Sequence, residues 1–268
     1  MWTTLAFVTT LVLAPAQTGE LRLTNARATY GVLGAPRKDN RVLPGDFYFI
    51  TFDIENLLVD SEGKIHYSMG MELINPDNEI EYKKTPQERP ITQYNVLGGT
   101  KIPAFAHAQT GVETKPGIYT LKVTVIDRLS KQQASLERKF EVIKPAFGLV
   151  ELSTSYDKDG IFSAPPMGVT GQSLFVNFWA VGFARNAKGQ PHIQLEMTIK
   201  DATGKMTHPK PITGEFTEIP KGWKRLPMQF PLSLNRTGRF TVTIKATDLI
   251  GGKKVDQISF PITVVELK

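Results

Sequence analysis

Residues 116–127 read PGIYTLKVTVID, and residues 237–248 read TGRFTVTIKATD. In each segment the second residue is a glycine, apolar side chains follow at every second position, and an aspartate comes last. This alternation is typical of a β-strand that buries one face. The apolar positions are Tyr119, Leu121, Val123 and Val125 in the first segment and Phe240, Val242, Ile244 and Ala246 in the second. The two segments predict equivalent strands in two related parts of the chain.

The similarity between the two parts extends well beyond these strands. Shifting the chain by 126 residues aligns residues 30–80 with residues 156–206 without a gap. The matched pairs include Tyr30 and Tyr156, Gly45 and Gly171, Phe52 and Phe178, His66 and His192, and Met71 and Met197. Ordered self-similarity of this kind indicates an internal duplication. We expect one domain over residues 17–144 and a second over 145–268, held at a narrow range of angles by the short joint around Pro145.

Composition favours an all-β fold. The 268 residues include 15 Phe and 7 Tyr, which suit strands, and 22 Gly and 18 Pro, which are spread between short apolar runs. Many short strands with frequent turns predict a sandwich or barrel. Each copy also ends one strand in a turn, at Asn78 and at Gly204, and we expect a left-handed residue at both positions. We predict about seven strands per copy, arranged as two packed sheets.

Segments 116–127 and 237–248, together with the last strands that carry Phe140 and Phe260, resemble the final hairpin of bacterial immunoglobulin-like domains. Those domains often end in a Gly-x-Tyr strand, an Asp, a Gly-rich turn and a strand ending in Phe-x-Val. The resemblance implies two tandem immunoglobulin-like β-sandwich domains, a module of exported surface and scaffold proteins, and no catalytic residues. The first copy departs from this pattern at residues 128–131, where its turn lacks glycine.

The N-terminus reads as a targeting segment. Residues 5–14 are mostly apolar, and Ala14-Pro15-Ala16 follows as a possible cleavage site. We therefore predict a signal peptide over residues 1–16 and a secreted or periplasmic protein. Because no Lys or Arg precedes the apolar run, a buried first strand is the alternative. No later apolar run reaches the length of a transmembrane helix, so we expect no transmembrane segment.

Charge and motif content exclude several function classes. The net charge is +6, and it is scattered along the chain, whereas nucleic-acid binding needs a basic face. The absence of cysteine excludes disulfides, thiolate catalysis and cysteine-based metal sites. The motifs of α/β-hydrolases, zinc proteases, dinucleotide-binding enzymes and P-loop enzymes are all missing. We expect no enzyme, cofactor or metal site, although a pair of glycosidase carboxylates is recognisable only from geometry.

Strand register points to one candidate ligand face. The inward positions are Tyr48, Ile50, Phe52 and Ile54 in the first copy and Leu174, Val176, Phe178 and Ala180 in the second. The opposite face then carries Phe47, Phe49, Thr51 and Asp53, and Ser173, Phe175, Asn177 and Trp179. The rings of Phe175 and Trp179 could stack on a sugar while the Asn177 amide bonds its hydroxyls. The alternative is that residues 84–116 or the neighbouring domain cover these rings.

Lys221-Gly222-Trp223-Lys224-Arg225 forms a second candidate, a basic loop with a central tryptophan. Trp223, Lys224 and Arg225 could hold an acidic polysaccharide or a lipid head group; the alternative is a solvated turn. We interpret His66 and His192 as surface histidines and residues 157–160 as a polar turn, because neither has metal-ligand spacing.

These features predict a non-catalytic secreted or periplasmic interaction or scaffold protein. Its two rigidly joined modules would face a protein or cell-envelope partner. The alternative is a carbohydrate-binding protein that uses aromatic side chains of the second domain. Because Trp179 and Trp223 both lie in that domain, we expect any ligand site to involve it more than the first.

Overall fold

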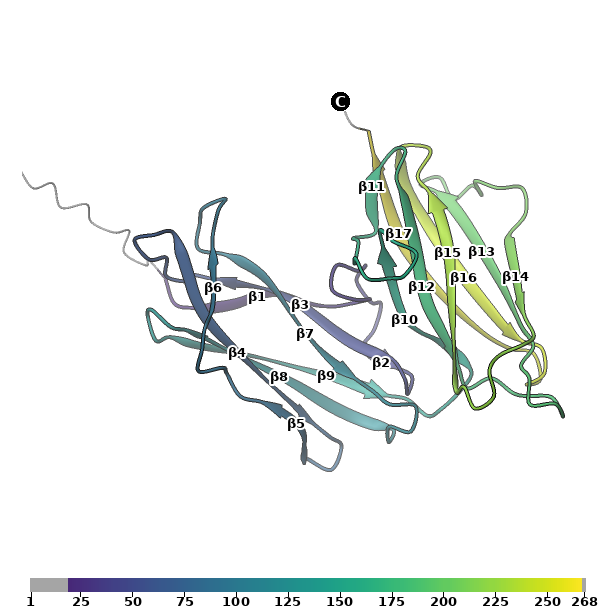
Figure 1. The fold of residues 1–268 in the computed structure, drawn as a ribbon, viewed down its shortest axis with the longest axis horizontal. Coiled ribbons are helices and arrows are strands. Elements are labelled where there is room, and N and C mark those ends of the chain that lie inside the picture. Colours follow the sequence, from purple (N-terminus) through teal and green to yellow (C-terminus); the bar gives the residue numbers. More distant parts are fainter. Residues whose placement is uncertain (1–18, 267–268) are drawn as a thin grey trace, which may run out of the picture.

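A computed structural model describes residues 19–266, and these residues form an all-β protein of several sheets (Figure 1). The predicted signal peptide, residues 1–16, lies outside the described residues. No helix within residues 19–266 has the length and apolarity that crossing a membrane requires. Residues 19–143 make up the first half of the protein, and residues 146–266 make up the second half.

The described residues form nine strands in the first half and eight in the second, more than the seven per copy expected. The first-half strands are β1 (Arg22–Thr29), β2 (Arg41–Val42), β3 (Phe47–Glu55), β4 (Lys64–Ile74), β5 (Ile80–Lys84), β6 (Ile91–Tyr94), β7 (Ile102–Gln109), β8 (Gly117–Asp127) and β9 (Gln133–Val142). The second-half strands are β10 (Gly148–Ser155), β11 (Met167–Val169), β12 (Ser173–Val181), β13 (Ile193–Asp201), β14 (Ile212–Phe216), β15 (Arg225–Ser233), β16 (Gly238–Asp248) and β17 (Lys254–Val265). Strands as short as β2 and β11 carry no detectable alternation, which explains the lower expected number.

The two halves have the same order of strands. The first half has a small sheet, β1-β3-β7, and a large sheet in the order β2-β9-β8-β4-β5, with β6 also paired to β4. The second half has β10-β12-β15 and β11-β17-β16-β13-β14. In each half the apolar faces of the small and the large sheet contribute to one buried cluster.

The predicted strand register is confirmed by burial. Tyr48, Ile50, Phe52 and Ile54 on β3 are buried, as are Leu174, Val176, Phe178 and Ala180 on β12. Both predicted turn positions are left-handed, with φ of 62° at Asn78 and 83° at Gly204. These positions follow from the alternation of apolar side chains and from turn chemistry alone.

A buried aspartate links the two sheets at equivalent places in both halves. Asp127 Oδ2 accepts hydrogen bonds from Leu58 N at 2.9 Å and from Ser130 Oγ at 2.8 Å. Asp248 Oδ2 accepts one from Ala184 N at 2.8 Å. Each aspartate therefore ties the hairpin of the large sheet to the loop that follows the central strand of the small sheet. The sequence marks both aspartates as strand ends but gives no sign of this link.

The sequence offers residues 84–116 as one cover for the rings of Phe175 and Trp179, but in the structure these residues contribute strands to the first half. Their longest strand, β7, pairs with β3 from Phe47 opposite Gln109 to Ile54 opposite Ile102, and so it widens the small sheet. The buried positions of β7 include Ala106 and Ala108, whose small side chains give a weak apolar pattern. Because of this weak pattern, the segment resembles a covering loop in the sequence.

The two halves are in direct contact. In Figure 1 most first-half strands run across the picture and the second-half strands run roughly vertically, and the loop between β1 and β2 reaches β10. Ala35, on this loop, is buried within the core cluster of the second half, and Tyr30 packs against the same cluster. The first half thus contributes side chains to the core of the second.

Candidate interdomain cleft

A cleft of about 590 Å³ lies where the two halves meet. One wall comes from the outer face of β3, with Phe47 and Phe49, and the facing wall comes from β12 and β15, with Asn177, Trp179 and Gln229. The loop of residues 30–34 lines this cleft and also a second hollow of about 760 Å³ over the outer face of the β1-β3-β7 sheet. The two hollows are therefore neighbours, separated by this loop.

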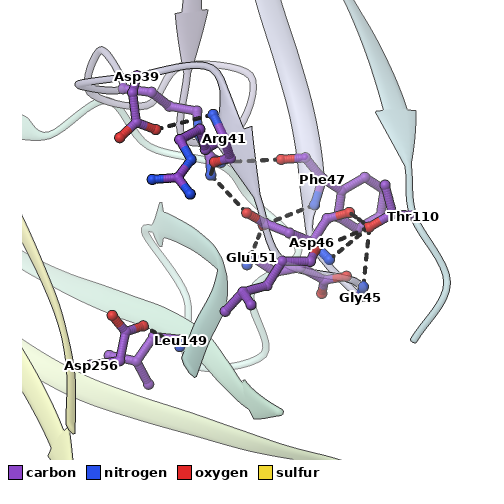
Figure 2. A network of polar contacts seen from close by, with 11 residues as sticks. Asp39, Arg41, Gly45, Asp46, Phe47, Thr110, Leu149, Glu151 and Asp256 are labelled. Atoms are coloured by element: carbon purple, nitrogen blue, oxygen red, sulfur yellow. Dashed lines mark hydrogen bonds and ion pairs between the residues drawn. The ribbon is translucent and has the colours of Figure 1, made fainter. Parts of the chain in front are cut away.

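Asp46 holds the base of the cleft together (Figure 2). Its Oδ1 accepts hydrogen bonds from Phe47 N at 2.8 Å and from Glu151 N, in the second half, at 2.7 Å. Its Oδ2 accepts from Arg37 Nη2 at 2.8 Å. The Arg37 and Asp46 side chains are 8% and 5% exposed, so this ion pair is buried. Paired charges of this kind fix geometry, because either one alone would be strongly destabilising.

Glu151 lies at a bulge in β10 where the register with β12 shifts, and its φ is 53°. In β1, Asn25 occupies the equivalent bulge, with φ of 52°. The left-handed conformation turns the Glu151 amide toward the first half, where it reaches Asp46. Both halves have this bulge, and only the bulge of the second half carries a hydrogen bond to the other half.

The Glu151 carboxylate extends the Asp46 network to Arg225 and Trp179. Its Oε2 lies 2.6 Å from Arg225 Nη2, and the Arg225 guanidinium stacks 4.6 Å from the centroid of the Trp179 ring. Burial raises the pKa of the Glu151 carboxyl, and the charge of Asp46 raises it further, whereas Arg225 lowers it. Arg225 is therefore the group that favours an ionised Glu151.

The predicted site residues on β12 are placed on the outer face, as expected, but they already have partners. The Asn177 Oδ1 accepts a hydrogen bond from Gln229 Nε2 at 2.6 Å, and its Nδ2 donates to Ser155 Oγ at 2.8 Å. One face of Trp179 is covered by Arg225. Phe175 is half-buried, opposite Pro231 on β15, and does not line the cleft.

The three candidate residues of the basic loop, Trp223, Lys224 and Arg225, have different partners in the structure. Trp223 is exposed, and its carbonyl oxygen accepts a hydrogen bond from Arg185. Lys224 Nζ forms an ion pair with Glu113 Oε1 of the first half at 2.6 Å, and Arg225 points into the Glu151 network. Lys224 and Arg225 thus contribute to the junction of the halves, Lys224 through an ion pair that is itself exposed at the surface.

Sequence reasoning missed two aromatic side chains beside the cleft, Phe105 and His107 on β7. The ring centroids of Phe47 and Phe49 lie 5.6 Å apart, those of Phe49 and Phe105 6.4 Å apart, and those of Phe49 and His107 5.0 Å apart. This aromatic row, defined as Phe47, Phe49, Phe105 and His107, covers the outer face of β3 and β7. The period-two pattern of residues 102–109 would have revealed it had they been interpreted as a strand paired to β3.

Burial among these rings lowers the pKa of His107 below its ordinary value of 6.5. The folded protein therefore takes up a proton on His107 at a lower pH than the unfolded chain, whose histidine titrates near the ordinary value of 6.5. Stability from this group is fully present above that pH and is lost as the pH falls through and below it. We expect thermal unfolding scans at about pH 7.5 and about pH 5 to show a smaller acid-induced decrease in Tm for His107→Phe than for the unaltered chain. Equal decreases in the two proteins would contradict this assignment.

The other predicted features are surface contacts. His66 Nε2 lies 2.7 Å from Asp60 Oδ2 and its Nδ1 lies 3.0 Å from Thr92 Oγ1, while His192 contacts Glu215. The Asp157 carboxylate accepts hydrogen bonds from backbone amides of its own loop, as a polar turn does. Within residues 19–266 no group of three or more His, Asp or Glu side chains is arranged to hold a metal ion.

No protein-family model matches the sequence, and no curated protein matches it. Solved structures align over most of the chain at low similarity. Red sea bream transglutaminase is 9% identical with a TM-score of 0.28, and the alignment covers 93% of this chain and 32% of that one. The C-terminal domain of the Streptococcus pyogenes antigen I/II-family protein AspA is 7% identical with a TM-score of 0.30, covering 91% and 100%. Latent PorU from Porphyromonas gingivalis is 9% identical with a TM-score of 0.38, covering 96% and 21%. These values carry no functional argument.

Proposed function

We propose that this chain is a non-catalytic secreted or periplasmic interaction protein made of two immunoglobulin-like β-sandwich domains that arose by duplication. The shared strand order, the equivalent bulges at Asn25 and Glu151, and the equivalent buried aspartates Asp127 and Asp248 support a duplication. The sequence repeat independently supports it. One buried cluster per half supports two sandwiches.

The cleft between the halves is the proposed binding site for a cell-envelope partner. The observation that supports this proposal is the exposed apolar surface at the rim of the cleft. Ile161 and Phe162 are 72% and 66% exposed on the loop whose residues Asp159, Gly160 and Ser163 line the cleft. Leu33, on the opposite loop, is also exposed. Large apolar side chains gathered at the mouth of a hollow are typical of an interaction surface.

Replacing the rim side chains tests this proposal. We expect the double variant Ile161→Ser, Phe162→Ser to weaken binding to a cell-envelope fraction of the source organism by at least about tenfold. The reason is that burying each side chain on binding contributes about 1.5–3 kcal/mol, and about 1.4 kcal/mol corresponds to a factor of ten. Binding is measured by biolayer interferometry on the immobilised chain, which reports captured protein and polysaccharide alike.

The matched control is Val96→Ser, Leu97→Ser, on a loop between β6 and β7 where these side chains are 84% and 96% exposed. This pair is equally apolar, and neither residue lines the cleft. Binding of the control variant should equal that of the unaltered chain. An equal loss in both double variants would show that general surface hydrophobicity, rather than the cleft, retains the partner.

A further inference from the structure

We propose that the cleft and the neighbouring hollow together hold a neutral oligosaccharide chain, which passes from the Trp179 wall to Phe105. This inference rests on the proposed function, because it names the ligand class for the same cleft. It is carried by three observations: the aromatic row, the pairing of the charges in the cleft, and the placement of both walls on sheet faces.

The aromatic row supplies apolar faces along the path. Phe47 and Phe49 line the cleft, and Phe105 lines the neighbouring hollow. Neighbouring rings are 5.6 Å and 6.4 Å apart, a spacing comparable to the length of one sugar ring. The C–H face of a sugar ring packs on an aromatic ring, while its hydroxyl groups stay at the edge. A row of rings therefore suits a ligand of several sugar units.

The charges of the cleft are paired with one another or with a neighbour. The Arg, Lys, Asp and Glu residues that line it, among residues 19–266, are Arg37, Asp46, Glu151, Lys158 and Asp159. Arg37 pairs with Asp46 at 2.8 Å and Lys158 with Asp159 at 2.8 Å, while Glu151 pairs at 2.6 Å with Arg225 beside the cleft. The Lys158 and Asp159 pair is exposed, but a ligand with a formal charge would have to disturb the Arg37 and Asp46 pair or the Glu151 and Arg225 pair to bind deep in the cleft. The inner part of the cleft therefore favours a neutral ligand.

The position of the cleft argues against an extended peptide. Peptides that bind by strand addition pair with the free backbone of a sheet edge. The middle of each cleft wall is instead built on β3 or β12, which are the central strands of their sheets and are paired on both sides, while the edge strands β10 and β15 contribute side chains beside β12. These walls present the side-chain faces of the sheets, with uncharged groups such as Ser153 and Gln229 beside the rings.

Phe105→Ala is the central test. Phe105 is 39% exposed, so its removal should leave the fold intact. The full chain is applied to a printed array of neutral and acidic oligosaccharides of several ring numbers, and the strongest neutral hexasaccharide is then titrated by calorimetry. We expect neutral sugars to bind, added salt to leave the affinity unchanged, and Phe105→Ala to weaken it at least about tenfold. Phe105→Trp should retain binding.

Tyr94→Ala is the matched control, because Tyr94 is an exposed aromatic residue on β6 that does not line either hollow. It should bind like the unaltered chain. Preference for acidic sugars with a steep salt dependence would overturn the proposal, as would neutral binding unaffected by Phe105→Ala. If no sugar binds while the envelope fraction is still captured through Ile161 and Phe162, the ligand class is wrong and the proposed function stands. If neither binds, both proposals are wrong.

Discussion

Val123→Asp is expected to unfold the first half of the protein. Val123 is fully buried near the middle of β8, between Met71 on β4 and Leu136 on β9. An unpaired carboxylate placed there loses its hydration without gaining a partner and destabilises by several kcal/mol. A domain of this kind has a total stability of about 5–15 kcal/mol. Differential scanning calorimetry should therefore show the loss of one of two transitions.

The effect should be asymmetric between the halves. Ala35 and Tyr30 of the first half pack on the core of the second half, whereas the first half's core contains only its own residues. Val123→Asp should consequently lower the remaining transition of the second half as well. The equivalent change in the second half, Ile244→Asp, should abolish the transition of that half and leave the first near its original temperature.

Two exposed positions provide the controls for these substitutions. Ile118 lies on β8 with Val123 and is 52% exposed, and Val255 lies on β17 and is 54% exposed. Ile118→Asp and Val255→Asp should change stability by under about 0.5 kcal/mol. If Ile118→Asp lowered the melting temperature as far as Val123→Asp, the assigned faces of β8 would be wrong.

The strands that could be predicted from the sequence are those in which apolar side chains alternate over a long run. In β8 and β16 the inward side chains are apolar, so the buried face of each strand follows from the side-chain period alone. β7 could not be predicted in this way because alanines fill its buried positions. Short strands such as β2 could not be predicted either, because two residues define no period.

The candidate site was only partly predictable, for a different reason. Register placed Asn177 and Trp179 on an outer face, and both line the cleft. Their partners, however, depend on how the two halves meet. Glu151 and Asp46 are 105 positions apart in the chain, and no local pattern indicates their bond. The neighbouring half lies across the cleft from these side chains and contributes Phe49 to it. A position beside the neighbouring half was one of the two alternatives that the sequence left open for this face.

Asp46→Ala is expected to produce the largest effect on the junction. The substitution leaves the buried Arg37 guanidinium without its carboxylate, and it removes the acceptor for Phe47 N and Glu151 N. Breaking a buried ion pair by removing one partner destabilises by about 3–5 kcal/mol. We expect a loss of this size in denaturant unfolding of the first half. Small-angle X-ray scattering should also show a wider range of angles between the halves, since one of the bonds that join them is gone.

The exposed ion pair between Arg41 and Glu141 is the matched control. Its side chains are 59% and 44% exposed, and its atoms are 3.1 Å apart, close to the separation of the Arg37 and Asp46 pair. Glu141→Ala should change stability by under about 1 kcal/mol, because water already solvates both charges. Equal losses for Asp46→Ala and Glu141→Ala would show that burial adds nothing to the Arg37 and Asp46 pair.

A double variant separates the ion pair from the bond across the junction. Replacing Arg37 by Met in the Asp46→Ala background removes the unpaired buried charge, so much of the lost stability of the first half should return. The bond to Glu151 N remains absent, however, because it depends on the Asp46 carboxylate and not on Arg37. Recovered stability together with a persistently wide range of interdomain angles is therefore the expected result. If the angles narrowed as stability returned, the Arg37 and Asp46 pair, rather than the bond to β10, would be what fixes the two halves relative to each other.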